Sequence, residues 1–300
     1  MNEILAPSFH KHWRQRRLVR RALRHAGRAF GLGGLFAWKL DDHWLRIERH
    51  EMPIPGLGAD LDGATLAQIS DLHRSPIVLE RYLGRCVEAI NELQPDFIAI
   101  TGDFITGPAH YARRVAMVLD RLHSRIATVA CLGNHDYGMM HPSGLGTMRG
   151  LAHAVTERLG HMDIFVMRNE ARIFHKGNAS LQFVGLEDYW TTFFNPEEAF
   201  ELARPDVPTI ALCHNPDAAP LLGDFPASWI LSGHTHGSPL PTGNLTGKVL
   251  PSTNRHFSAG HYPLANGTQQ LYVNRGLGYG RRSNLNSRPE VTLFTLRTAE

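Results

Sequence analysis

The chain repeats one kind of junction five times: a short apolar run that ends in a glycine or a polar residue. Such runs followed by a turn are typical of buried strands covered on both faces. The junctions are Asp71-Leu72-His73 after residues 66–69, Gly102-Asp103 after 97–100, Gly133-Asn134-His135-Asp136 after 129–132, His214 after 210–213, and Gly233-His234-Thr235-His236-Gly237 after 229–231. Each junction sets a carboxylate, an amide or an imidazole at the end of a predicted strand.

Helical spacing between the apolar runs predicts an alternating α/β fold. The predicted helices span residues 78–93, 111–123, 147–159 and 196–203, and further strands are predicted at 44–51, 164–167, 171–175, 181–186, 270–274 and 291–296. This alternation is typical of a mostly parallel sheet covered by helices, with ligands beyond the carboxyl ends of the strands. The Gly, Pro and Asn-rich stretch 237–260 is predicted to be a long functional loop.

Composition indicates a soluble globular protein without a disulfide framework. The hydrophobic fraction of 43% and charged fraction of 20% are ordinary for that class. The three cysteines, two of them inside apolar runs, are expected to be buried reduced thiols, and the absence of Cys-x-x-Cys argues against a thiolate zinc site. No apolar stretch reaches the roughly 18 residues of a membrane-spanning helix, and no secretory signal is expected.

Charge divides the chain into a basic segment, residues 1–40, and one predicted domain, residues 41–300. The first 40 residues hold nine Lys or Arg and one acid, a charge of +8, so the remainder carries +3 minus 8, or −5. Residues 12–30 form a predicted amphipathic helix with arginines opposite its apolar arc. We favour binding of residues 11–38 to an anionic membrane surface, where each basic residue is worth about 1 kcal/mol. Docking on the domain is the alternative, and nucleic acid ranks third because no recognition module accompanies the segment.

The polar residues at the five junctions match the needs of a two-metal site. Asp, Asn and His suit Mn, Fe, Zn or Mg, and two such ions about 3.5–4 Å apart clamp a phosphoryl group and activate a water. Each motif alone is more often a turn or a cap than a ligand. All of them together at strand ends indicate a metal centre.

These motifs, in this order, resemble those of the calcineurin-like metallophosphoesterase family over about residues 65–240. The resemblance implies a sandwich of two mixed β-sheets flanked by α-helices and a pair of divalent ions, with Mn²⁺ favoured over Fe, Zn or Mg. By the same resemblance the first ion is held by Asp71, His73, Asp103 and His236, and the second by Asp103 as the bridge with Asn134, His214 and His234.

The resemblance also implies two catalytic residues that are not metal ligands. His135 would face the substrate, where it stabilises the phosphoryl oxygens or protonates the leaving oxygen. Asp136 would orient the His135 ring, as ring nitrogens usually require.

Within the family, the C-terminal runs 271–278 and 288–293 resemble a bacterial branch of membrane-associated phosphodiesterases. That branch includes enzymes that cleave the pyrophosphate of UDP-2,3-diacylglucosamine in lipid A synthesis. The resemblance implies a phosphoesterase acting on a lipid nucleotide, placed in the cytoplasm on the inner face of the cytoplasmic membrane. The alternatives are a phosphodiesterase or phosphatase for a soluble nucleotide or a phosphoprotein, and a non-catalytic membrane-surface scaffold on the same fold.

Two arginines are candidate phosphate ligands. Arg74 follows the Asp-x-His motif, where the family more often has an apolar residue, and its guanidinium either forks onto a phosphate or makes a salt bridge. Arg275, with Arg281 and Arg282, forms a second candidate clamp.

Overall fold

The computed structural model of the protein describes residues 45–237, 257–264, 267–278 and 288–299. The predicted basic helix and membrane contact at residues 11–38 lie outside these residues, as do Arg281, Arg282 and most of the predicted loop 237–260.

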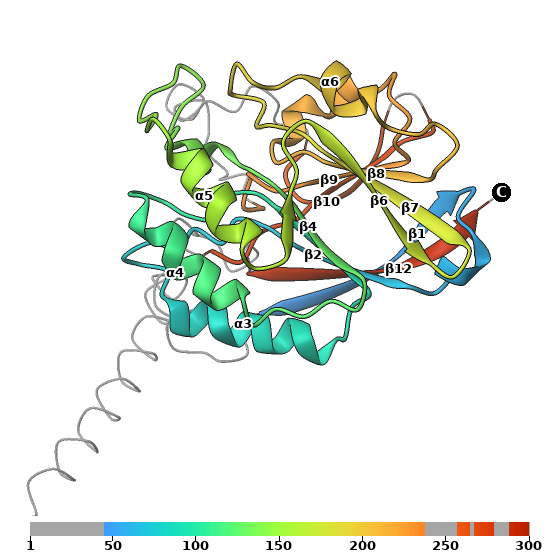
Figure 1. Ribbon diagram of the computed structural model, residues 1–300, viewed down its shortest axis with the longest axis horizontal. Coiled ribbons are helices and arrows are strands. Elements are labelled where there is room, and N and C mark those ends of the chain that lie inside the picture. The colour runs from blue at the N-terminus through green and yellow to red at the C-terminus, as the bar shows by residue number, and fades with distance from the viewer. Residues whose placement is uncertain (1–44, 238–256, 265–266, 279–287, 300) are drawn as a thin grey trace, which may run out of the picture.

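Two six-stranded sheets form the centre of the fold (Figure 1). The first has the order β1 (Arg46–Pro55), β12 (Glu290–Ala299), β2 (Thr65–Ile69), β3 (Phe97–Thr101), β4 (Ala127–Cys131) and β5 (Ile164–Val166). The second has the order β10 (Gly260–Pro263), β11 (Gln270–Val273), β9 (Trp229–Ser232), β8 (Thr209–Leu212), β7 (Ala179–Gly185) and β6 (Glu170–Lys176).

Both sheets are mixed, which confirms the expected two-sheet sandwich and corrects the single, mostly parallel sheet that the alternation alone predicts. The strands β2, β3, β4 and β5 run parallel, but β12 returns antiparallel to β2. In the second sheet β7, β8, β9 and β11 are parallel, while β6 and β10 pair antiparallel at the edges. The strands β6 and β7 form a hairpin around residues 177–178, which a two-residue connection permits only between antiparallel strands.

Helices cover the outer face of each sheet. On the first sheet lie α3 (Glu80–Glu92), α4 (His110–Leu119) and α5 (Leu151–Gly160), and on the second lie α6 (Pro196–Glu201) and the 3₁₀ helix η3 (Pro216–Leu222). The helix α3 buries Leu83, Val87 and Ile90, a helical spacing that sets one apolar face on the sheet. The helix α5 begins at Leu151, later than predicted, because Gly150 before it has a left-handed φ of 77°.

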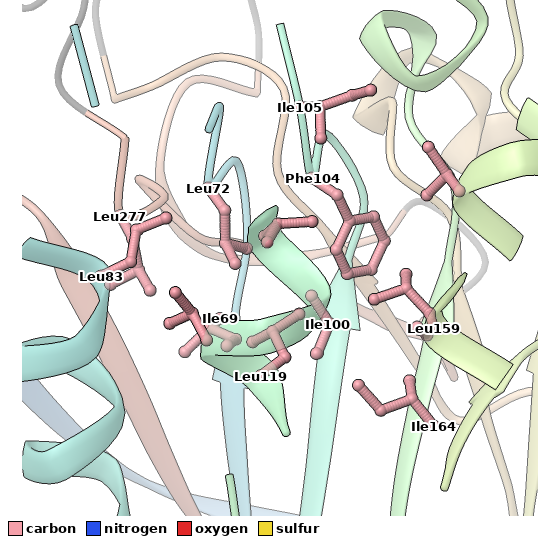
Figure 2. Close-up of a cluster of buried hydrophobic side chains, with 14 of the residues drawn as sticks. Ile69, Leu72, Leu83, Ile100, Phe104, Ile105, Leu119, Leu159, Ile164 and Leu277 are labelled. Atoms are coloured by element: carbon pink, nitrogen blue, oxygen red, sulfur yellow. The ribbon is translucent and has the colours of Figure 1, made fainter. Parts of the chain in front are cut away.

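Three buried apolar clusters fill the spaces between the layers. Figure 2 shows the cluster beneath α3, α4 and α5, where Ile69 and Ile100 meet Leu83, Leu119 and Leu159. A second cluster joins the two sheets, and a third joins the second sheet to α6 and η3. These layers bring the carboxyl ends of β2, β3 and β4 beside those of β8 and β9.

All three cysteines are buried and free, as the sequence predicts. The helices of the described ranges include none with both the length and the apolar character needed to cross a bilayer.

Candidate metal centre

Backbone hydrogen bonds beyond the strand ends hold the predicted site residues together. The N–H of Asp71 donates to the carbonyl of Gly102 at 2.9 Å, and that of His73 donates to the carbonyl of Asp103 at 2.9 Å. A bond across the two sheets runs from the side-chain amide of Gln68 to the carbonyl of Ser232 at 2.9 Å. The loops after β2, β3 and β9 are therefore fixed relative to one another.

Five predicted ligands have left-handed backbone conformations. The φ angles are 50° at Asp71, 48° at His73, 57° at Asp103, 71° at His234 and 55° at His236. This region is costly for residues other than glycine, and such strain persists where the surrounding structure imposes it. The concentration of strained residues at one point marks this edge of the sandwich as functional.

Glycines allow the two sheets to approach at the same point. A side chain at Gly102, whose φ is 83°, would set Cβ 2.6 Å from the Nδ1 atom of His214. At Gly233 a Cβ would lie 1.8 Å from the hydroxyl oxygen of Ser70. The glycines of these two motifs therefore serve the close contact between the strand ends.

Asp71, His73 and His236 form the first group of donor atoms. The Nε2 atoms of His73 and His236 lie 2.9 Å apart. The Oδ1 atom of Asp71 is 3.6 Å from His73 Nε2 and 3.4 Å from His236 Nε2. Three donors thus converge on one point, in the size range of a cation site.

Asp103 lies between this group and a second one. Its Oδ2 atom is 3.5 Å from His73 Nε2 and 3.2 Å from His214 Nε2. The Nδ1 atom of His214 is 2.6 Å from the carbonyl oxygen of Thr101, which can only accept, so Nδ1 carries the proton and Nε2 is available. One carboxylate oxygen therefore faces both groups.

Asn134 and His234 complete the second group. Asn134 Oδ1 lies 3.0 Å from His234 Nδ1. The side-chain amide nitrogen of Asn134 donates to the carbonyl of Met139 at 2.7 Å, which aims the amide oxygen at the site. The seven residues predicted as ligands are all brought together.

The donor set fits divalent cations. Carboxylates, an amide oxygen and imidazole nitrogens are the ligands that Mn, Fe, Zn and Mg take in proteins. Within the described residues, Asp71 Oδ1 and His214 Nε2 are buried and make no hydrogen bond, although both face other ligands. Buried polar atoms are rarely left without partners, and a pair of bound cations would satisfy both atoms.

Electrostatics in the group favour ionised carboxylates. Burial alone would raise the pKa of Asp103, but the surrounding imidazoles, His214 first, hold it well below its usual value. Burial would likewise raise the pKa of Asp71, and His236 and His73 reverse that effect. Burial lowers the pKa of His234 to about 4, so this ring is neutral and able to ligate at pH 7.

His135 lies beside the donor set, next to His73 and Asp103. Its backbone N–H donates to Asp103 Oδ1 at 2.8 Å, and its ring meets the His73 ring edge to face at 4.8 Å between centroids. Burial lowers the pKa of His135 to about 4, so the ring is neutral at pH 7. The ring is thus close to the site, and among the residues that the structure describes no hydrogen bond ties it to a partner.

Asp136 makes contacts that differ from the predicted ones. Its Oδ1 atom accepts from the backbone N–H groups of Phe104 at 2.9 Å and Ile105 at 3.2 Å, and its Oδ2 atom accepts from Gly133 at 3.0 Å. The carboxylate joins the loops after β3 and β4 and is fully buried. It therefore positions the backbone that carries Asp103 and His135 and makes no bond to the His135 ring.

Both candidate arginines are held by acidic residues. Arg74 is buried, donates to Glu80 Oε1 at 2.7 Å, and bonds the carbonyl oxygens of Ser75 and Val78. The sequence allowed either a salt bridge or phosphate binding for Arg74, and the structure has the salt bridge. The guanidinium of Arg275 pairs with the buried carboxylate of Glu290 and lies 3.8 Å from Glu48.

Residues after β7 join the site and were not predicted. The Trp190 ring meets the His234 ring edge to face at 4.8 Å between centroids. Asp188 is fully buried, and burial raises its pKa to about 7. Glu187 accepts from Tyr137 and from Arg168. A sequence signal for these residues existed, because they follow the predicted strand 181–186 in the same way that the five motifs follow theirs.

Comparisons with known proteins identify several similar sequences and structures. The sequence profile of the family described as calcineurin-like phosphoesterase matches residues 64–238. The UDP-2,3-diacylglucosamine pyrophosphatase LpxG of Chlamydia trachomatis is 30% identical, over 87% of this chain and 92% of the relative. The phosphodiesterase YaeI of Escherichia coli is 32% identical over 76% of this chain and 80% of the relative. The solved structure of TT1561 from Thermus thermophilus superposes with a TM-score of 0.47 at 12% identity, over 71% of this chain and 89% of that one.

Proposed function

Because the chain belongs to the calcineurin-like phosphoesterase family and is a metal-dependent phosphoester hydrolase with a dinuclear divalent metal centre, we propose a substrate for it. The proposed reaction is hydrolysis of the pyrophosphate bond of a membrane-associated lipid nucleotide such as UDP-2,3-diacylglucosamine. The observation that carries the substrate is the similarity to LpxG along nearly the whole of both chains. That similarity spans 87% of this chain and so extends well beyond the residues 64–238 that the family profile matches.

The proposed ligand assignment follows the two groups of donor atoms. Asp71, His73 and His236 would hold one ion, and Asn134, His214 and His234 the other. Asp103 would bridge them, which its Oδ2 atom supports by facing both His73 and His214. When bound, the two ions supply an activated water and neutralise the charge on the phosphoryl oxygens.

The remaining residues position the substrate and the loops. His135 would donate a ring N–H to a phosphoryl oxygen or to the leaving oxygen, because its ring contacts that of the proposed ligand His73. Asp136 would keep the loops after β3 and β4 in register, so that Asp103 and His135 stay aligned. The Trp190 ring would fix the orientation of His234.

A basic segment suits this substrate. Residues 11–38 would bind the anionic inner face of the cytoplasmic membrane, where a diacylated nucleotide resides. A phosphodiesterase acting on a soluble nucleotide is the second candidate, supported by the similarity to YaeI. Manganese is the proposed ion, with iron, zinc and magnesium compatible with the same ligands.

The test is turnover with and without added Mn²⁺ on UDP-2,3-diacylglucosamine, bis-p-nitrophenyl phosphate and p-nitrophenyl phosphate. We expect metal-dependent release of UMP from the lipid nucleotide, and loss of that activity in Asp103→Asn. The exposed Asp120 provides the matched control Asp120→Asn, which should retain full activity. Hydrolysis of the generic diester alone would refute the lipid substrate and favour the second candidate.

A further inference from the structure

Exposed apolar side chains gather on the loops that surround the metal centre. The described residues expose eleven large apolar side chains, and six of these lie in the loops that follow β2, β4 and β7. The six are Ile77, Leu79, Met140, Leu145, Met148 and Phe193. We call Met140, Leu145, Met148 and Phe193 the apolar rim; their exposed fractions run from 42% to 68%.

The apolar rim adjoins the site directly. The Phe193 ring stacks on the Tyr137 ring at 6.4 Å between centroids, and Tyr137 follows His135 by two residues. Trp190, three residues before Phe193, contacts the ring of His234. The two loops of the rim thus meet beside the metal ligands, and Figure 1 shows both rising from the same side of the sandwich, ahead of α5 and α6.

The loop after β4 has a defined shape that presents its apolar side chains outward. The backbone N–H of Met140 donates to the carbonyl of Leu145 at 2.8 Å, and that of Met148 donates to the carbonyl of Tyr137 at 2.9 Å. Leu145 stands near the tip of this small hairpin-like loop and is 68% exposed. Protruding apolar side chains on an ordered loop are suited to insertion into an interface, whereas a site for a single acyl chain would enclose them.

Charge around the rim complements a bilayer surface. Residues 138–150 and 189–195 contain no Asp or Glu, and they hold one arginine, Arg149, and one histidine, His141. The rest of the domain is acidic on balance, since residues 41–300 carry a net charge of −5. Acids return beyond these loops, where the exposed Glu197 and Glu198 lie in the first turn of α6 and Asn169 donates both to the carbonyl of Phe193 and to the carboxylate of Glu198. The two loops themselves, without acids and with apolar tips, add no repulsion by anionic lipids and gain from burial in the acyl boundary.

We propose that the apolar rim docks on the lipid bilayer and holds the mouth of the metal centre at the level of the lipid headgroups. This inference rests on the proposed function, because a diacylated nucleotide must present its pyrophosphate to the ions while its acyl chains stay in the membrane. The rim is a second membrane contact, distinct from residues 11–38. It orients the site, which a basic segment at the end of the chain does not do.

The direct test places a reporter on the rim of the full chain. The three native cysteines are buried, so Leu145→Cys can be labelled selectively with nitrobenzoxadiazole. Leu202→Cys is the matched control, because Leu202 is 84% exposed and follows α6. With vesicles of phosphatidylcholine and phosphatidylglycerol we expect a blue shift and a rise in emission at residue 145 and neither at residue 202. The proposal is overturned if both labels respond equally, if neither responds, or if the label at 145 is already blue-shifted without vesicles, which would mean that the chain itself covers the rim.

A second experiment measures binding. The double variant Met140→Gln/Leu145→Gln is compared with Leu202→Gln/Leu221→Gln, in about 0.5 M NaCl to screen the attraction of the basic segment. We expect the rim variant to bind vesicles at least about tenfold more weakly than the control variant. Equal vesicle binding by the two variants would contradict the docking role.

The outcomes separate this inference from the proposed function. If the enzyme fails to hydrolyse UDP-2,3-diacylglucosamine while the label at residue 145 enters the bilayer, the substrate is wrong and the docking surface stands. If the lipid nucleotide is hydrolysed and the label does not respond, the substrate stands and the docking surface is wrong.

Discussion

Asp136 gives the sharpest test of how the site is held together. The structure has its carboxylate accepting three backbone N–H bonds from Gly133, Phe104 and Ile105, all of them buried. In Asp136→Asn the amide oxygen can still accept from the N–H groups of Phe104 and Ile105. The amide nitrogen then faces the N–H of Gly133, which loses its acceptor.

The expected change combines that lost bond with the loss of a charge. A bond to a charged acceptor that leaves a buried N–H unpaired costs about 1.5–3 kcal/mol. In the opposite direction, burial and the nearby Asp103 carboxylate raise the pKa of Asp136 to about 7, so the ionised carboxylate costs the folded protein roughly 4 kcal/mol above that pH, and Asn removes this cost. We expect the free energy of unfolding at pH 8.5 to rise by about 1–2 kcal/mol, and the midpoint of thermal unfolding to rise by about 2–6 °C.

The assay is thermal and urea unfolding of the metal-free protein at pH 8.5, followed by circular dichroism, with turnover measured on the metal-loaded enzyme. Asp120→Asn is the control, since an exposed substitution changes stability by less than about 0.5 kcal/mol. A fall in the unfolding midpoint of Asp136→Asn at pH 8.5 would refute this reasoning. A drop in kcat of a hundredfold or more with an unchanged midpoint would return Asp136 to the role of orienting the His135 ring.

Three further predictions concern Arg74, the loss of stability at low pH, and the removal of metal. Arg74→Met should lower the free energy of unfolding by about 1–2 kcal/mol, because the bonds to Glu80 and to backbone carbonyls are lost. The same variant should change kcat/KM on bis-p-nitrophenyl phosphate less than threefold. A large rise in KM would mean that Arg74 binds phosphate. The bonds from Arg74 and Arg114 outweigh burial and lower the pKa of Glu80 to about 2. The stability that Glu80 contributes is therefore present above its unfolded pKa and is lost as pH falls from about 4 toward 2. Glu80→Gln should flatten the dependence of the free energy of unfolding on pH in that range, and parallel curves for the variant and the wild type would contradict the sign. Removing metal with EDTA should lower the free energy of unfolding by about 2.7 kcal/mol relative to protein held at 100 times the dissociation constant, and an unfolding midpoint indifferent to metal would argue against the dinuclear centre in the folded protein.

Much of this protein can be predicted from sequence because its signals are local. The core strands β2, β3, β4, β8 and β9 are short, mostly apolar runs of the correct length, with Gln68 in β2 and Thr128 in β4 as the polar exceptions inside them. The helices α3 and α4 show clear apolar spacing. The short elements η2 (Asn134–Tyr137), η3 and β10 were not predicted, because segments of four to seven residues hold too few positions for a pattern to stand out.

Pairing of distant side chains was beyond sequence reasoning. Arg74 beside Glu80 reads equally well as a phosphate ligand or an ion pair, and only the packing of the loop onto α3 decided between them. The carboxylate of Asp136 lies next to His135 in sequence, yet its partners are backbone groups across the loop. Trp190 became part of the site through contact with His234 across the fold.

The sequence by itself determined the chemistry of this protein: the donor types, their order, and their place at the ends of buried strands. Side-chain identity fixes which ions can be bound, and apolar runs fix where strands end. Tertiary structure alone decided which atoms face one another, which residues are strained, and which apolar side chains remain exposed beside the site. Those properties depend on how two mixed sheets pack face to face, and the distances between their loops are set by contacts between residues far apart along the chain.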